Sequence, residues 1–206
     1  MLQDPDFHQQ IEEAIRLAEV RTSAELVVVL AASSGSYRDT DLLAGAALAL
    51  LSLGTMIWAP FPIAELLALS NSVLAFMVGT LACRFSPMLR RLLTTQKRRL
   101  AQVRLSAEAA FRQEGVGATR ERNGLLLYFS LLERNVEILP DVGVEGRVEP
   151  AEWHKIRHKL LSEKGLSSFK AGVIPALTAC GETLSSVFPP APQNPDEIPN
   201  RPRIRP

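Results

Sequence analysis

One apolar block, residues 42–83, constrains this chain more than any other feature. It is interrupted only by Ala59-Pro60-Phe61-Pro62 and by the single charge of Glu65. Each half has about the 17–25 residues that a helix needs to cross the hydrocarbon core of a bilayer. Prolines between the halves stop one helix and start the next. The block therefore predicts a transmembrane helical hairpin over residues 42–83. The alternative is a buried hairpin in a soluble protein, which two adjacent spans of this length disfavour.

Lysine and arginine predict the orientation of this hairpin. The connector between its halves has neither residue, whereas Arg38 precedes the first half and a dense group of cations follows the second half. The positive-inside rule then places both termini in the cytoplasm. The first residues lack the basic flank and apolar core of a signal peptide. We therefore expect a multi-pass protein of the bacterial inner (plasma) membrane, targeted by its own first span.

The cations after the second span also predict contact with the membrane surface. They are Arg90, Arg91, Lys97, Arg98 and Arg99. Each can attract anionic lipid headgroups with about 1 kcal/mol near the surface. The alternative is that they only set topology on a solvated helix face. With a formal net charge of +1, the chain lacks the strongly basic balance of a nucleic-acid binder, so no nucleic-acid partner is expected.

One polar side chain, Asn71, lies in the middle of the second apolar half. An amide in lipid is expected to hydrogen-bond the neighbouring helix, which contributes on the order of 0.6–2 kcal/mol. A transport path is the alternative, but no charge accompanies Asn71 within the span.

The rest of the chain predicts an α/β domain. Apolar residues recur at helical spacing from Phe7 to Ala18, and a Val- and Leu-rich strand follows over 25–31. After the hairpin we expect one long helix from Leu89 to Phe111, strands over 125–130 and 136–139, and two further helices. A right-handed crossover makes the first two strands parallel, and the short turn before the third makes it antiparallel. The proline-rich, charged tail over 189–206 is expected to be disordered.

Four motifs, in this order, resemble the bacterial TPM-domain family. They are Thr22-Ser23-Ala24-Glu25 before the first strand, Asn123-Gly124 before the second, Glu133-Arg134-Asn135 with Asp141-x-Gly143, and Trp153-x-x-Ile156. The resemblance runs from about Phe7 to Pro189 and favours the branch with a membrane hairpin inside the domain. It implies a three-layer α/β/α domain with a small mixed sheet. That domain is discontinuous over 7–188, made of 7–38 and 87–188, and is interrupted by the hairpin.

The resemblance also implies two kinds of activity. Acid phosphatase activity and divalent-ion binding are attributed to some TPM-domain proteins, and help in the repair of membrane complexes to others. This chain departs from the better-known members, because Ala24 replaces a glycine and Asp141–Gly146 reproduces only part of a glycine-rich stretch. These departures weigh against the transfer of enzymatic activity.

The candidate ligands for a metal are Asp141, Glu145 and Glu25. A turn that supplies carboxylates and carbonyls suits a hard cation such as Ca²⁺ or Mg²⁺. Asp-x-Gly is also ordinary turn chemistry, so a purely structural role is the alternative. His154 and His158 stand four residues apart on a predicted helix, but neighbouring cations and the lack of a third ligand disfavour a metal there. No cofactor and no catalytic residue is assigned.

We therefore expect a membrane-tethered accessory or interaction protein. Its partners would be other membrane proteins, and its role would lie in the assembly or quality control of membrane complexes. A divalent-metal-dependent phosphatase is the first alternative. A small oligomeric transport subunit, whose spans approach closely through Gly45, Gly54 and Gly79, is the second.

Overall fold

The computed structural model describes residues 2–60, 62–162, 166–191 and 197–205. The chain forms two compact units. The first contains residues 1–34 and 100–206, and the second contains residues 35–99.

The first unit is built on a four-stranded sheet in the order β3-β2-β1-β4. Strands β1 (Leu26–Ala31) and β2 (Leu125–Ser130) are parallel, with Leu26 opposite Leu125. Strand β3 (Asn135–Pro140) returns antiparallel to β2. The predicted parallel and antiparallel pairings are thus confirmed. Every residue of β1 and β2 is buried, as the continuous apolar runs of these strands indicate.

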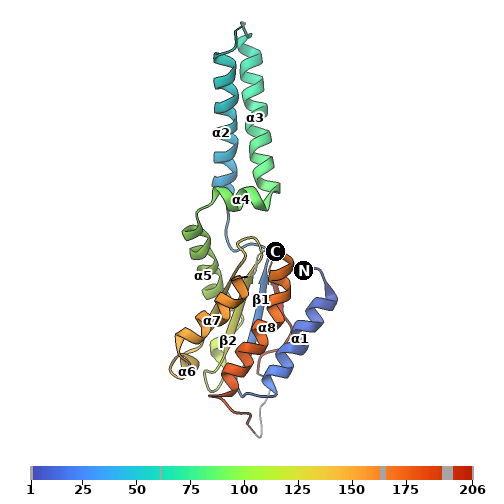
Figure 1. Cartoon of the computed structure of the whole chain (residues 1–206), viewed down its shortest axis with the longest axis vertical. Coiled ribbons are helices and arrows are strands. Elements are labelled where there is room, and N and C mark those ends of the chain that lie inside the picture. Colours follow the sequence, from blue (N-terminus) through green and yellow to red (C-terminus); the bar gives the residue numbers. More distant parts are fainter. Residues whose placement is uncertain (1, 61, 163–165, 192–196, 206) are drawn as a thin grey trace. The chain divides into compact units, whose positions relative to one another are not determined.

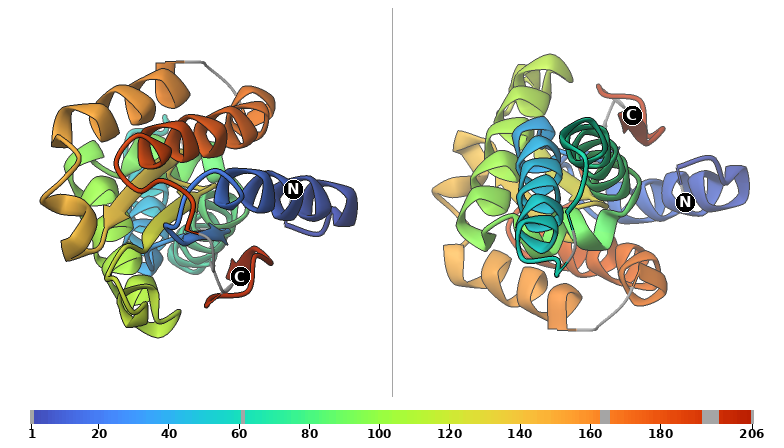
Figure 2. Two further views of the ribbon diagram at one scale, coloured as in Figure 1. Left: turned by 90° about the horizontal axis from the view of Figure 1, so that it is seen from below. Right: turned by 90° about the horizontal axis from the view of Figure 1, so that it is seen from above.

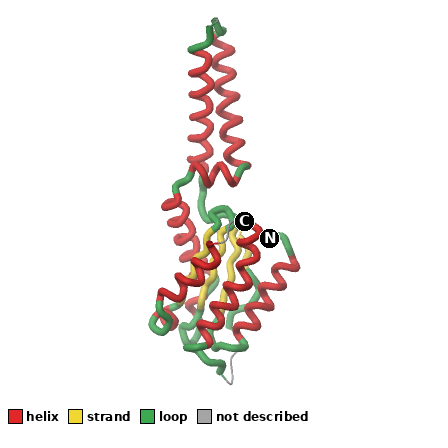
Figure 3. The backbone as a smooth tube through the Cα atoms, in the orientation of Figure 1, coloured by secondary structure: helices red, strands yellow, loops and turns green. Residues whose placement is uncertain are grey.

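Helices cover both faces of this sheet. Leu26, Val28 and Leu30 of β1 face a core shared with α1 (Pro5–Glu19), α7 (Pro150–Ser162) and α8 (Leu166–Ser185). Val27, Val29 and Ala31 face a smaller core shared with α5 (Gln96–Gln113) and the 3-10 turn η1 (Val116–Ala118). This split follows from the alternation of side chains along a strand. Figures 2 and 3 show the sheet between its two helical layers, which confirms the three-layer α/β/α prediction.

The end of the chain corrects the prediction of a disordered tail over 189–206. Residues Arg203–Arg205 form β4, which pairs parallel with β1, and Ile198 is buried in the smaller core. Arg203 and Arg205 both pair with Glu114 of α5, at 3.0 and 2.9 Å. An edge strand is held mainly by backbone hydrogen bonds, which composition does not reveal. Residues 192–196 of this segment lie outside the described part of the chain.

The second unit is a helical hairpin. Helices α2 (Arg38–Ile57) and α3 (Glu65–Phe85) pack along each other, and α4 (Pro87–Leu93) follows α3 (Figure 1). Both α2 and α3 are long and apolar enough to cross a membrane.

The predicted single helix from Leu89 to Phe111 is in fact two helices. The chain is extended at Thr94, between α4 and α5. Two β-branched threonines in succession favour this break, and the hydroxyl of Thr95 accepts a hydrogen bond from the amide of Arg98 in the first turn of α5.

Candidate functional site

The two long helices of the hairpin meet through small residues. A Cβ added to Gly45 of α2 would lie 2.1 Å from Oγ1 of Thr80, and one added to Gly79 of α3 would lie 3.0 Å from Cα of Gly45. Glycine therefore allows the two backbones to approach closely here, as in membrane helix pairs. Gly54 has no such neighbour within 4 Å, so Gly45 and Gly79 form the contact point.

A polar contact joins the same two helices further along. The amide nitrogen of Asn71 on α3 donates a hydrogen bond to Oγ of Ser52 on α2, at 2.6 Å, and lies 3.7 Å from the sulfur of Met56. Both Asn71 and Ser52 are half-buried. The amide thus lies toward the partner helix, and its bond fixes the rotation of one helix about the other.

Ion pairs connect the start of α2 to the residues that follow α3. We call this end of the hairpin its base. Arg90 of α4 donates from Nε to Oδ1 of Asp41, in the first turn of α2, at 2.8 Å, and its second nitrogen reaches the other oxygen. Arg98 binds Asp39 in the same bidentate manner, at 2.6 and 2.9 Å, and its guanidinium lies 5.7 Å from the centre of the Tyr37 ring. Acidic residues also suit the N-terminal turn of a helix.

These contacts show how the predicted membrane-surface cations are engaged. Arg90 and Arg98 bind aspartates, and Nη1 of Arg99 donates to the carbonyls of Thr94, at 2.6 Å, and of Arg91. Arg91 is half-buried, and Lys97 is exposed with no ion pair to a described residue. Arg90, Arg98 and Arg99 therefore hold the hairpin base together, whatever else they bind.

In the first unit, a hydroxyl cluster lies where the two parallel strands end. Oγ of Ser34, three residues after β1, lies 2.6 Å from Oγ of Ser130, the last residue of β2, and 3.3 Å from the hydroxyl of Tyr128. Ser130 also donates to the buried carboxylate of Glu133, which accepts from the Ser34 amide at 3.0 Å. Ligands in α/β proteins often bind at this end of parallel strands. Here the polar groups are bonded to one another.

The sequence analysis did not find this cluster. The only signal was that each parallel strand leads into polar residues, serines after β1 and Glu133 after β2. Neither run is specific enough to predict the contacts between them.

At the opposite end of the sheet, Asp141 binds an arginine. Nε and Nη2 of Arg122 donate to the two carboxylate oxygens of Asp141, at 2.7 and 2.9 Å, and the amide of Val142 donates to Oδ1 at 2.9 Å. Burial acts to raise the pKa of the Asp141 carboxyl, but these hydrogen bonds and the charge of Arg122 outweigh it, so the pKa falls below its ordinary value. Gly143 completes the turn, because a Cβ there would lie 2.5 Å from the carbonyl oxygen of Arg122.

This arrangement does not suit a hard cation. Both oxygens of Asp141 already bind the positive charge of Arg122. Glu25, at the start of β1, accepts from the amides of Glu197 and Ile198 at 3.4 and 3.3 Å, and Glu145 at the end of α6 (Val142–Glu145) is exposed. Within the described ranges, no group of three His, Cys, Asp or Glu residues is placed to hold a metal ion. The structure instead gives Asp141-x-Gly143 a structural role in the turn.

His154 and His158 are both exposed on α7, next to Lys155 and Lys159. They lie on the outer side of that helix, and its buried residues Trp153 and Leu160 face the core.

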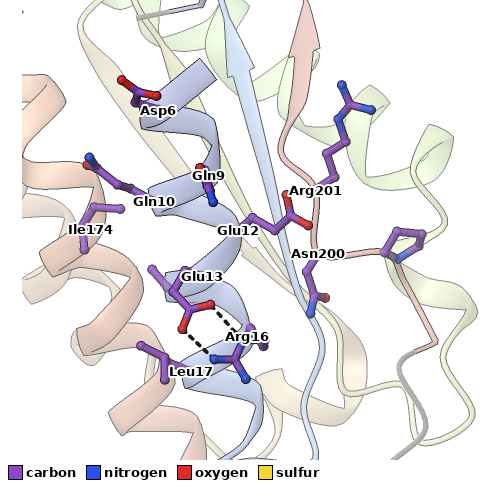
Figure 4. A pocket seen from close by; sticks show the side chains of 12 residues that line it. Asp6, Gln9, Gln10, Glu12, Glu13, Arg16, Leu17, Ile174, Asn200 and Arg201 are labelled. Carbon is purple, nitrogen blue, oxygen red and sulfur yellow. Dashed lines mark hydrogen bonds and ion pairs between the residues drawn. The ribbon is translucent and has the colours of Figure 1, made fainter. Parts of the chain in front are cut away.

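A wide, open depression lies beside α1 (Figure 4). It has a volume of about 1390 Å³ and is lined by Asp6, Glu12 and Glu13 of α1, by Ile174 of α8 and by Asn200 before β4. Glu13 forms a bidentate ion pair with Arg16 on the same helix, at 2.9 and 2.6 Å. Arg16 and Arg201 also line the depression, so its three carboxylates are partly balanced by two arginines.

The comparisons with known proteins agree with this architecture. A protein-family model described as "TPM domain" matches residues 91–183. The NMR structure of BA42 protein from the psychrophilic bacterium Bizionia argentinensis is similar, with a TM-score of 0.59 and 18% sequence identity. That match covers 98% of this chain and 94% of BA42, and at this identity it concerns the fold alone. No curated protein matches the sequence. The resemblance drawn from the motifs is thus confirmed by the match to a TPM domain over residues 91–183.

Proposed function

We propose that this protein is a membrane-anchored accessory module. Helices α2 and α3 cross the bilayer as a hairpin, and the α/β unit serves as an interaction domain on the cytoplasmic side. The observation that carries the proposal is the exposed apolar surface of the two helices.

That surface is too apolar and too open for a core helix. Only 17% and 11% of the most apolar stretches of α2 and α3 are buried. Leu50 is 70% exposed and Leu66 is 78% exposed, and comparable residues follow along both helices. Burying each such side chain in an apolar medium gains roughly 1.5–3 kcal/mol. In water a patch of this kind would drive aggregation, so lipid is the medium that fits it.

The charges at the two ends of the hairpin support the orientation. The connector between α2 and α3 holds prolines but no lysine or arginine, and Glu65 begins α3, whereas arginines cluster at the other end of the hairpin. The positive-inside rule places that other end in the cytoplasm. Asp39 and Asp41 are each matched by an arginine there, so the base of the hairpin presents compensated charge near the interface.

Extraction of membranes tests the anchoring. Alkaline carbonate should leave the wild-type protein in the membrane pellet. Leu50→Asp with Leu74→Asp places two charges in the middle of the spans, each costing about 2.5–3.5 kcal/mol there, and should release the protein. Leu105→Asp, on an exposed position of α5, is the matched control and should change nothing. Release of the wild-type chain by carbonate would contradict the proposal.

A phosphatase is the rival function that the TPM resemblance implies. Purified full-length protein should be assayed against phosphomonoesters with and without Mg²⁺, Mn²⁺ or Ca²⁺. We expect no turnover, because both oxygens of Asp141 are bound to Arg122. Metal-dependent turnover that Asp141→Asn abolishes and Glu149→Gln retains would replace the accessory role by an enzymatic one.

The proposed partners are other membrane proteins and the lipids themselves. Tandem purification from membranes would identify the proteins. Solute flux through liposomes that contain the purified chain would instead support a transport subunit. That function would require the hairpins to assemble into an oligomer.

A further inference from the structure

The helices on one face of the sheet form a layer with an ordered charge pattern. Helix α8 contacts both α1 and α7 and lies between them, as Figure 2 shows. The order of the helices across the outer surface of the layer is therefore α7, α8, α1.

The two outer helices carry opposite charge. The exposed face of α1 bears the carboxylates of Asp6, Glu12 and Glu13 against the single cation Arg16. The exposed face of α7 bears Lys155 and Lys159, with His154 and His158 beside them, and the half-buried Glu152 forms an ion pair with Lys155. One edge of the layer is thus acidic and the other basic.

The central helix exposes mainly small side chains on its outer side, and Glu182 near its C-terminal end is an exposed charge. Ala171, Pro175 and Thr178 are exposed there. Ala171 and Pro175 line a mainly apolar groove of about 270 Å³ between α7 and α8, and Lys155 and Lys159 line it from α7. Pro175 has no N–H to donate, so the carbonyl of Ala171 lacks its usual partner four residues on.

We propose that two copies of this protein pair face to face through the α7–α8–α1 layer, about a two-fold axis parallel to α8. A two-fold axis in this direction places α7 of one copy over α1 of the other, so each basic edge meets an acidic edge. A two-fold axis across the helices would instead place α7 on α7 and α1 on α1, and like charges would face each other. The charges of the two outer helices thus favour a second copy as the partner and an axis parallel to α8.

The apolar groups on the layer match the same arrangement. The depression beside α1 includes Ile174 and Leu17, and the groove beside α7 includes Ala171 and Pro175. The depression and the groove lie beside the same turns of α8. A two-fold axis parallel to that helix does not shift one copy along it, so the depression of one copy lies opposite the groove of the other. Leu17 is 54% exposed on α1 and lines the depression beside that helix. It faces the groove of the second copy, with Glu13 near the lysines of the groove's rim.

Charge exchange tests this pairing on the full-length protein in detergent or nanodiscs. Lys155→Glu with Lys159→Glu makes both edges of the layer acidic. Asp6→Lys with Glu13→Lys makes both edges basic. Each double variant alone should self-associate about tenfold more weakly than the wild type, because both contacts become repulsive. Co-expressed with different tags, the two variants should form a mixed dimer, because both contacts are then attractive.

Cross-linking locates the interface. Ala171→Cys should form a disulfide between copies because α8 lies on the axis, whereas Leu105→Cys, on α5 at the other face of the sheet, should not. The native thiols Cys83 and Cys180 are buried, so wild-type protein serves as the blank.

Three results would overturn the proposal. They are a wild-type chain that stays monomeric at all concentrations, two double variants that fail to pair when mixed, and equal cross-linking at positions 171 and 105. None of these results depends on whether the hairpin spans a membrane, so the anchoring proposal is tested separately.

Discussion

Asp41, in the first turn of α2, is held by Arg90 of α4 through both oxygens, with Nε to Oδ1 at 2.8 Å. This bidentate pair ties the start of the hairpin to the segment that leaves it. The Asp41 side chain is only 6% exposed, and the Arg90 side chain 23%. The hairpin is therefore closed at its base by a partly buried charge pair.

Replacing Asp41 by Asn should weaken this closure. The substitution removes a charge-assisted pair and leaves Arg90 half-buried without its counter-charge, which costs about 1.5–3 kcal/mol. Unfolding of the full chain in mixed micelles measures the loss. The matched control is Asp39→Asn, because the Asp39–Arg98 pair is more exposed and should contribute at most about 1 kcal/mol. Equal effects of the two substitutions would contradict the role given to Asp41.

Asn71 and Ser52 should act as a pair. Asn71→Leu makes the span more apolar and should keep membrane insertion, but it should loosen the hairpin by about 0.6–2 kcal/mol. Ser52→Ala should have a similar effect, and the double variant should be little worse than either single one. Cross-linking between cysteines placed on α2 and α3 provides the measurement. Fully additive losses would mean that the two side chains do not bind each other.

Asp141 should make stability depend on pH in the acid range. Because the pKa of its carboxyl lies below the ordinary value of 3.8, its contribution is complete well above that value and is lost as the pH falls through the lower, folded-state pKa. In Arg122→Gln, burial raises the pKa of Asp141, so acid unfolding should begin at a higher pH. Circular dichroism during acid titration measures this shift. A lower unfolding pH in the variant would contradict the assigned pair.

The end of the chain should contribute to stability. Truncation after Pro202 removes β4, and with it the edge pairing of β1 and both ion pairs of Glu114. The lost backbone bonds predict a destabilisation of about 1–3 kcal/mol, measured by denaturant unfolding. Ile204→Ala is the control, since Ile204 is 44% exposed and backbone pairing does not need its side chain. Unchanged stability after truncation would mean that β4 does not contribute to the stability of the fold.

The sequence predicted elements whose pattern is local. The apolar runs of β1 and β2, the spacing of Phe7, Ile11, Ile15 and Ala18, and the two long apolar helices are each legible over a few turns. The sequence did not predict β4, because Arg203–Arg205 has no apolar pattern and forms a strand through its pairing with β1. The sequence did not predict the break at Thr94 either, because apolar residues continue at helical spacing on both sides of it.

The contacts of the candidate sites were less predictable than the fold. Asp141 was recognised as a turn residue, but nothing in the sequence indicated that Arg122, nineteen positions earlier, would bind both of its oxygens. Ser34 and Ser130 lie ninety-six positions apart and meet only because β1 and β2 are parallel neighbours. Contacts of this kind depend on register and side-chain direction, which periodicity does not specify.

The central claim is that α2 and α3 cross the bilayer with both flanks in the cytoplasm. Its most direct test is labelling of single cysteines with a membrane-impermeant maleimide, with one at Ile63 in the connector and one at Ser36 before α2. In cells with a permeabilised outer membrane and an intact inner membrane, we predict that Ile63→Cys is labelled at once. Ser36→Cys should react only after the inner membrane is opened. Labelling of Ser36→Cys across an intact inner membrane would contradict the account.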